Sequence, residues 1–433
     1  MTLPPTHLQR LELNDEVHAR PPEALVAPLR LSYLALFLDA VPREAAWQAV
    51  HDLAARFGAP LPEPGATHYS ADLGPFRVKW EQHTEFTRYK FIVAGADDGD
   101  PFGSPAIGTV PADWLAGLPG QILVAAHVAL LPAGRGDVDP EEASARLFRG
   151  NPVIGATVAG GAAVALTDFR IHPDGFSRVL VQAAGTTPRQ AGRLVQRLVE
   201  IDTYRMLALM ALPVARSLAP FLSQSEQELA GITAALVNAA EADEAPLLER
   251  LTRLEAAIEH RQSTTLFRFS AAEAYYGLVQ QRTAELREER LPGLSTFQEF
   301  TDRRLAPAMG TARAVAARQE SLSRRLARAT QLLSTRVDLT RERQNQALLE
   351  SVDRRAKLQL RLQETVEGLS AAALTYYVVG LVGYAAKGLK AAGVRPGGLE
   401  VDPELAMAMS IPVVALVIVL GVRRLRHRIM REA

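Results

Sequence analysis

Cysteine is absent from the 433 residues of this chain. Disulfides, thiolate nucleophiles and cysteine-based zinc sites are therefore excluded, and the absence is compatible with a reducing cytoplasm. The chain also has no net charge, because 48 lysines and arginines balance 48 aspartates and glutamates. No global field recruits nucleic acid, so we expect no nucleic-acid partner, and any electrostatic function must be local.

Familiar catalytic motifs are missing as well. The sequence has no Walker loop, no dinucleotide fingerprint and no His-Glu-x-x-His pattern. We therefore expect neither an enzyme nor a bound cofactor. The first twenty residues also lack the apolar run of a signal peptide, so we expect the large N-terminal part to stay where it is made, in the cytoplasm.

Proline is absent from the long interval between Pro307 and Pro396. This interval is rich in alanine, leucine, arginine, glutamine and glutamate, which are strong helix formers. The sequence predicts one continuous helix over 311–386, on the order of 115 Å long. Its apolar residues recur at mixed three- and four-residue intervals, which is typical of a helix packing on other helices and not of a simple two-stranded coiled coil.

Charged residues are missing from two stretches near the C-terminal end, 368–386 and 405–422. Each is long enough to cross a hydrocarbon core about 30 Å thick, so we predict membrane spans at about 368–387 and 404–422. The alternative is a pair of buried helices in a globular core. A third apolar stretch, 206–215, is too short to span a bilayer and is expected to be a buried helix of a soluble domain.

Basic residues flank the two predicted spans unevenly. The loop between them, 387–404, carries few basic residues, and acidic residues offset these. The positive-inside bias predicts a bacterial inner-membrane protein with both termini in the cytoplasm and this loop outside. The basic residues on the inner flanks are Arg354, Arg355, Lys357, Arg361, Arg423, Arg424, Arg426, Arg428 and Arg431.

The first half of the chain alternates strand and helix signals. Pro188, preceded by two threonines, marks the start of a longer helix. From about Pro220 the strand signals vanish, and we expect helix breaks at Pro246, Pro292 and Pro307. Strands are expected at 29–38, 76–93, 122–131, 162–171 and 176–183, and shorter helices at 43–57 and 140–148.

The expected fold is therefore an α+β membrane protein with three parts. A cytoplasmic mixed α/β domain covers 1–215. A helical bundle with a long stalk helix covers 216–367. A transmembrane two-helix hairpin with a basic tail covers 368–433.

This layout resembles the CorA-type two-span metal-ion transporters, and the resemblance covers nearly the whole chain as architecture. It implies a homo-pentamer whose first spans line a central pore. In that family a Gly-Met-Asn tripeptide at the outer mouth holds a hydrated cation. Here residues 376–388 read YYVVGLVGYAAKG. If Gly383 takes the place of the tripeptide's glycine, Tyr384 replaces the methionine and Ala385 the asparagine, so the resemblance does not extend to magnesium transport.

Three sequence boxes are similar to those of a family of uncharacterised bacterial membrane-anchored proteins. They are LNDEVHARP at 13–21, WEQHTEF at 80–86 and YYVVGLVGY at 376–384. That family has no assigned activity. The resemblance therefore implies a topology and not a function.

Polar residues recur every seven positions along the first predicted span. Gln363, Ser370, Tyr377 and Tyr384 would share one helix face with about 20° of drift per step. Polar groups inside a membrane usually face a bundle interior or water, so this face is the candidate pore lining. The alternative is that Tyr384 is an interfacial anchor and Ser370 bonds its own helix backbone.

Three more residues complete the pore-lining candidates. Gly380 and Gly383 permit close helix approach, which equally suits a tight oligomer that does not conduct. Lys387 ends the span on the outer side. In a ring of copies it would repel divalent cations and favour anions, whereas alone it would reach outward to lipid headgroups.

Acidic residues form two candidate cation-attracting groups on the cytoplasmic side. Glu241, Asp243 and Glu244 lie at an expected helix–helix turn, where CorA-type proteins concentrate or sense cations; the alternative is a solvated loop. Glu364 and Glu367 lie at the inner end of the first span. They would attract cations or would simply be solvated charges of the helix surface.

A weaker metal candidate lies in the second box. Glu81, His83 and Glu85 would share one strand face and offer two carboxylates and an imidazole to a divalent metal. A half-exposed polar strand face gives the same pattern.

The expected function is a CorA-like homo-oligomeric ion transporter or channel that lacks the Gly-Met-Asn filter, with magnesium an improbable ion. The expected partners are the lipid bilayer and further copies of the chain. The alternative is a non-conducting membrane-anchored scaffold or regulatory protein.

Overall fold

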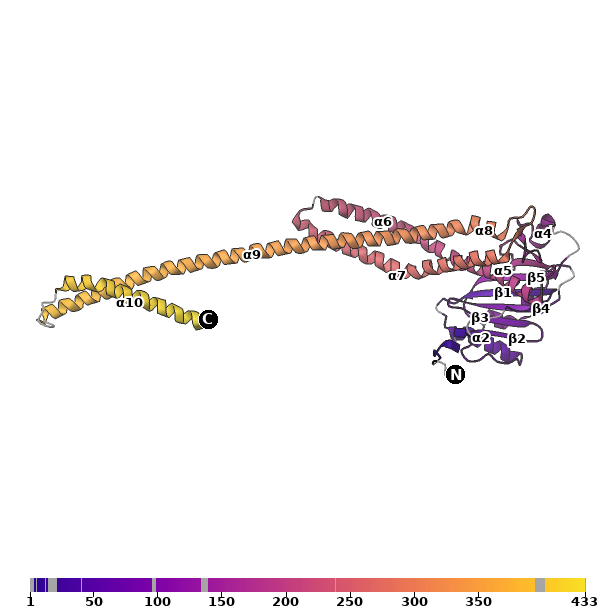
Figure 1. Cartoon of the computed structure of the whole chain (residues 1–433), viewed down its shortest axis with the longest axis horizontal. Helices are drawn as coiled ribbons and strands as arrows, with labels where there is room; N and C mark the ends of the chain where they lie inside the picture. Colours follow the sequence, from indigo (N-terminus) through magenta and orange to yellow (C-terminus); the bar gives the residue numbers. More distant parts are fainter. Residues whose placement is uncertain are drawn as a thin grey trace. The chain divides into compact units, whose positions relative to one another are not determined.

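The structure is a computed structural model that describes residues 4, 6–11, 13–14, 22–39, 41–95, 99–133, 139–237, 239–393 and 402–432 (Figure 1). The chain divides into two compact units. The first comprises 1–239 and 246–331, and the second comprises 240–245 and 332–433. These bounds differ from the expected domains, since 216–239 and 246–331 belong to the first unit.

One mixed sheet forms the base of the first unit. Its nine described strands follow the order β2-β3-β4-β1-β5-β8-β7-β6-β9. β5 and β8 are parallel, and the other neighbouring pairs are antiparallel. The strands are β1 (Leu29–Phe37), β2 (His68–Asp72), β3 (Arg77–Gln82), β4 (Phe86–Ala94), β5 (Gln121–Pro132), β6 (Ile154–Val158), β7 (Ala163–Thr167), β8 (Ser177–Ala183) and β9 (Glu289–Arg290).

Strand β1 lies inside the sheet and is buried on both faces. It pairs with β4 on one side and β5 on the other, and nearly all of its residues are buried. Its sequence, LRLSYLALF, is almost continuously apolar, which is typical of a strand buried on both faces. The mixed α/β character and the strand expected at 29–38 are thus confirmed.

One face of the sheet carries an apolar core. Trp80, Tyr89 and Phe91 are fully buried there against Val50 and Leu53 of α2. Burying an aromatic side chain of this size contributes a few kcal/mol to folding. The short helices of this part are α2 (Arg43–Arg56), η1 (Ala106–Thr109), α3 (Ala112–Ala116) and α4 (Pro140–Leu147).

The opposite face is covered by α5 (Pro188–Leu209). The Tyr33 hydroxyl of β1 lies 2.8 Å from the Thr203 hydroxyl of this helix. Thr187 and Gln190 form a reciprocal capping box, and Pro188 occupies the first helical position. The helix start predicted from the sequence is confirmed.

Helix α6 (Ala211–Val237) follows α5 after Met210 alone. The stretch 206–215 is helical and partly buried, as expected, but it is shared between α5 and α6 and does not form a helix of its own. Helix α6 continues through Arg216 and includes Pro220. The N-terminal part of α5 packs on β5 and β8 and buries Leu194 and Leu198.

Helices α7 (Glu241–Leu286) and α8 (Phe297–Arg304) follow. The break expected at Pro246 is wrong, because Pro246 lies in the second turn of α7. There it removes one backbone hydrogen bond without ending the helix. Pro292 lies between α7 and α8, and Pro307 is the second residue of the next helix, as expected.

The predicted long helix is confirmed as α9 (Ala306–Ala391), which exceeds the expected 311–386 at both ends. Helix α10 (Pro403–Glu432) runs beside the end of α9 in the second unit (Figure 1). By length and composition alone, three helical stretches of the described chain are sufficient to cross a membrane: Pro188–Val237, Phe297–Ala391 and Pro403–Arg424. The last two contain the spans predicted from the sequence.

Candidate functional site

Gly383 is the point at which α9 and α10 approach most tightly in the second unit. A Cβ atom placed on Gly383 would lie 2.4 Å from the Met407 Sδ atom. Ala386, one turn further on, is also buried. Gly380 has open space at the same position. Gly383 therefore faces α10 within the chain, and its absent side chain permits the contact.

The four polar residues with seven-residue spacing lie on one exposed face of α9. Tyr377 and Tyr384 are 70% and 73% exposed, and Gln363 and Ser370 are exposed too. Each residue turns a helix by about 100°, so this line is rotated by about 100–160° from Gly383. We call these four residues the polar stripe. The structure brings them together on one exposed face, as the spacing predicted.

Two surface cavities lie along α9 in the second unit. The tyrosine cavity has a volume of about 590 Å³, and the glutamate cavity about 430 Å³. Both include candidates named from the sequence. The tyrosine cavity is lined by Tyr376, Tyr377, Val379, Gly380, Leu381, Gly383, Tyr384, Lys387 and Met407. The glutamate cavity is lined by Gln359, Leu362, Gln363, Val366, Glu367, Ser370, Ala371, Leu374 and Val422.

The candidate acidic residues separate into two places. Glu244 is buried, with its carboxylate 2.5 Å from the Arg336 guanidinium and 3.3 Å from the Thr340 hydroxyl. Asp243 accepts a hydrogen bond from the Ala240 backbone at 3.3 Å. A solvated loop is thus wrong for Glu244, which fixes the start of α7 to α9. The side chain of Glu241 lies outside the described residues.

Glu364 and Glu367 lie on α9 before the predicted span. Glu367 accepts a hydrogen bond from the Gln363 amide at 3.0 Å and lines the glutamate cavity. Glu364 is exposed and does not line that cavity. Of this pair, Glu367 is the carboxylate that faces a cavity.

The metal candidate Glu81, His83 and Glu85 does not form one site. β3 ends at Gln82 and the chain reverses into β4, so the three residues do not share a strand face. Glu81 pairs with Arg88, whereas Glu85 pairs with Arg268 and accepts a hydrogen bond from Tyr275. His83 stacks on Phe86. Within the described chain no three metal-binding side chains gather, and the strand-face prediction is wrong.

A network of buried charges links this β3–β4 hairpin to α5 and α7. Arg88 contacts Glu81 and lies 2.9 Å from Glu200, which also binds Arg282 at 2.7 Å. Burial would raise the Glu81 pKa, but the charges of Arg88 and nearby lysines outweigh it and lower the pKa to about 2. Both carboxylates are therefore ionised. Glu81 binds Arg88 within the hairpin, and Glu200 links Arg88 to Arg282 of α7.

Lys90 is buried in the same layer, directly opposite Lys79 on β3 and Tyr33 on β1. Burial and the positive charge of Arg88 lower the Lys90 pKa to about 7. This layer of buried charged residues was not predicted from the sequence. A pattern that indicates it is present, because lysine, glutamate and arginine alternate with aromatic residues in parts of 77–91.

Two buried histidines lie on the strands and turns around β5 and β7. His127 Nδ1 is 3.0 Å from the Ser32 hydroxyl, and its Nε2 is 4.0 Å from Asp174. Burial lowers the His127 pKa to about 4, so the ring is neutral. His172 Nε2 lies 2.9 Å from Asp168. Ser32 is fully buried, and its hydroxyl oxygen accepts a hydrogen bond from the Ile107 backbone amide. Ser32 and His127 therefore stabilise the core and do not present a nucleophile.

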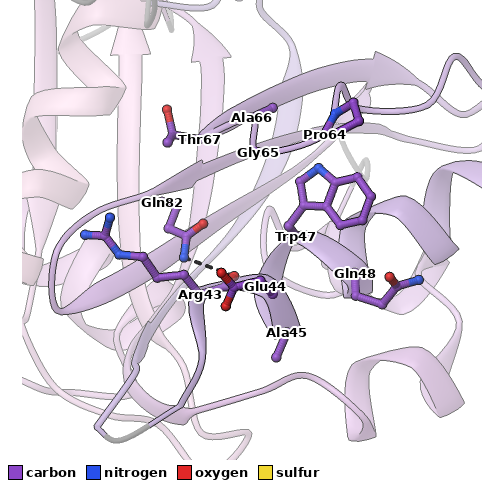
Figure 2. Close-up of a pocket in the computed structure, with 10 residues that line it drawn as sticks. All are labelled: Arg43, Glu44, Ala45, Trp47, Gln48, Pro64, Gly65, Ala66, Thr67 and Gln82. Carbon is purple, nitrogen blue, oxygen red and sulfur yellow. Dashed lines mark hydrogen bonds between the residues drawn. The ribbon is translucent and has the colours of Figure 1, made fainter.

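An open cavity of about 610 Å³ lies between the start of α2 and the turn before β2 (Figure 2). The Gln82 amide donates to the Arg43 carbonyl at 3.2 Å, and the Trp47 indole donates to the Glu63 carbonyl at 2.8 Å. No described side chain caps the start of α2. Arg43 and Glu44 both line the cavity, so their opposite charges define no ligand class.

Comparison with known proteins places the chain in a family. The chain matches the family described as "Protein of unknown function (DUF3422)" over residues 5–429, and it belongs to that family. No curated protein and no solved structure matches it. Within the LNDEVHARP box, residues 15–21 lie outside the described structure.

Proposed function

We propose that the chain is a homo-oligomeric membrane protein in which the polar stripes of several α9 helices line a path for ions. The observation that carries this proposal is the exposure of Gln363, Ser370, Tyr377 and Tyr384 along one face of α9. A polar face inside a bilayer needs a partner or water. One hairpin supplies a single such face, so several copies are required to enclose a path.

The membrane part consists, in this proposal, of the ends of α9 and α10. Large apolar side chains on both helices are exposed in the described chain, including Leu369 at 74% and Leu416 at 60%. A bilayer supplies the apolar surroundings that these residues lack. The stretch that contains α5 is not assigned to the membrane, because Leu194 and Leu198 are buried where α5 packs on the sheet.

The arrangement proposed is CorA-like, with five copies, cytoplasmic termini and an altered outer mouth. Ala385 offers no side-chain acceptor where that architecture has an asparagine. A hydrated divalent cation therefore loses its ligand. Magnesium is accordingly not the ion that we propose.

A non-conducting scaffold is the second candidate. Leu374, Val378 and Leu381 are 51%, 36% and 66% exposed, and they lie beside the polar stripe. Apolar side chains of this size seal an axis by excluding water. An oligomer closed by these residues would anchor and organise the first unit without ion flow.

The number of copies tests the requirement that both candidates share. The purified full chain should have the mass of a symmetric oligomer, with five copies expected, in both detergent and nanodiscs. Mass photometry and native mass spectrometry measure this mass. A strict monomer in both media would contradict the ion path.

A further inference from the structure

The tyrosine cavity combines a cationic residue with an apolar wall. Its lining includes Lys387 and three tyrosines, and the wall includes Leu381 and Met407. Within the part of the chain that the structure describes, no carboxylate lies within 4.0 Å of the Lys387 ammonium. Among the described residues, the cavity thus offers a positive charge that no carboxylate pairs.

Lys387 does not lie on the polar stripe. It follows Tyr384 by three residues, which turns it by about 60° back toward Gly383 and α10. Gly380, seven residues earlier, lies on the same flank and lines the same cavity. Lys387 therefore lies closer than the stripe to the contact between α9 and α10 at Gly383.

The position of the cavity matches a membrane interface. It lies at the end of the predicted span, where tyrosine and lysine side chains commonly meet headgroups. The glutamate cavity near the other end is lined by the Glu367 carboxylate and lacks a cationic lining residue. The two cavities therefore differ in the sign of the charged residue that lines them.

We propose that the tyrosine cavity binds the headgroup of an anionic phospholipid. The phosphate binds the Lys387 ammonium, while the glycerol and upper acyl chain pack on Leu381 and Met407. This inference rests on the proposed membrane insertion, but not on ion conduction. It assigns Lys387 to lipid recognition and leaves the polar stripe to the contacts between copies.

Native mass spectrometry of the purified full chain tests the proposal. Phosphatidylglycerol and phosphatidylcholine are added in equal amounts, and the lipid retained per chain is counted. A single lysine near an anionic headgroup corresponds to about a fivefold preference for phosphatidylglycerol. Lys387→Gln should reduce this preference to near unity, and Lys387→Arg should keep it. Lys390→Gln is the matched control, since Lys390 lies one turn further along α9 and does not line the cavity.

The outcomes separate the possible sources of the anion. An unchanged preference in Lys387→Gln would overturn the proposal. Inorganic phosphate in large excess should leave the bound phosphatidylglycerol in place, and full displacement would overturn a lipid site in favour of a free-anion site. Ion flux is measured on the same preparations. Loss of lipid preference in Lys387→Gln with flux at the wild-type level supports the lipid site. A wild type that prefers phosphatidylglycerol but conducts no ion also supports the lipid site, and this result contradicts only the ion path.

Discussion

Glu200 is the residue through which the buried charges of the first unit are joined. Its carboxylate binds Arg88 and Arg282 and accepts a hydrogen bond from Gln196 at 2.8 Å. Glu200→Gln should lower the free energy of unfolding by about 3 kcal/mol, because it leaves the buried Arg88 with one carboxylate fewer. Chemical denaturation followed by tryptophan fluorescence reports on this unit, since Trp47, Trp80 and Trp114 all lie in it.

Glu285→Gln is the matched control for that measurement. Glu285 pairs with Arg197 and Arg282, but its side chain is 31% exposed. Water screens such a pair, so the substitution should cost less than about 1 kcal/mol. Equal effects of the two substitutions would contradict the importance of the buried position.

His127 predicts a dependence of stability on acid pH. Its pKa is about 4 in the folded chain, against an ordinary value near 6.5 in the unfolded chain. The unfolded state therefore binds the proton first, and stability is lost as pH falls from about 6.5 to about 4. His127→Gln should remove this contribution. The difference in unfolding free energy between wild type and variant should rise from pH 4 to pH 6.5 and then level off; a flat difference would show that the ring is not held neutral.

At the residue scale the sequence predicted which residues carry charge but not their partners. Glu81 and Glu85 were placed on one strand face because they are four apart. The strand ends at Gln82. Glu81 binds Arg88 of the next strand, whereas Glu85 binds Arg268 of α7, which is 183 residues away. Spacing along a strand holds only within the strand, and a partner on a distant helix follows from the tertiary packing.

Helix contact at Gly383 gives a prediction at the scale of elements. Gly383→Leu would place side-chain atoms where Met407 lies, so α10 should shift away from α9. The matched control is Gly380→Leu, since open space surrounds the Cβ position of Gly380. Because the chain has no cysteine, spin labels can be attached at two introduced cysteines, Leu381→Cys and Met409→Cys.

The distance distribution between these labels is the measurement. It should broaden and lengthen in Gly383→Leu and stay unchanged in Gly380→Leu. The same response in both variants would mean that Gly383 is not the close contact between the helices.

The elements predicted best are those with long, regular patterns. Strand β1 was predicted from a continuous apolar run. The start of α5 was predicted from its proline, and α9 from an interval without proline. Three strands were not predicted from the sequence: β2, whose sequence HYSAD is short and polar, β6, which has five residues, and β9, which has two. Such strands are fixed by their neighbours in the sheet and not by their own composition. β7 is shorter than expected because the backbone turns at Phe169, which has a positive φ of 49°.

At the scale of the whole molecule, the chain belongs to its family over residues 5–429. The seven-residue spacing predicted that Gln363, Ser370, Tyr377 and Tyr384 share one helix face, because α9 is continuous through all four. The position of Lys387 beside α10 could not be predicted, because the sequence does not show where α10 contacts α9.

The central claim is that the polar stripe lines an ion path, and flux in proteoliposomes tests it most directly. Potassium, nickel, magnesium and chloride are measured for wild type, Ser370→Cys on the stripe and Leu369→Cys beside it. A charged thiol reagent should block flux at Ser370→Cys and spare both Leu369→Cys and the cysteine-free wild type. The account predicts flux of at least one ion, weak magnesium flux and this pattern of block. No flux of any ion, or equal block at both positions, would contradict it.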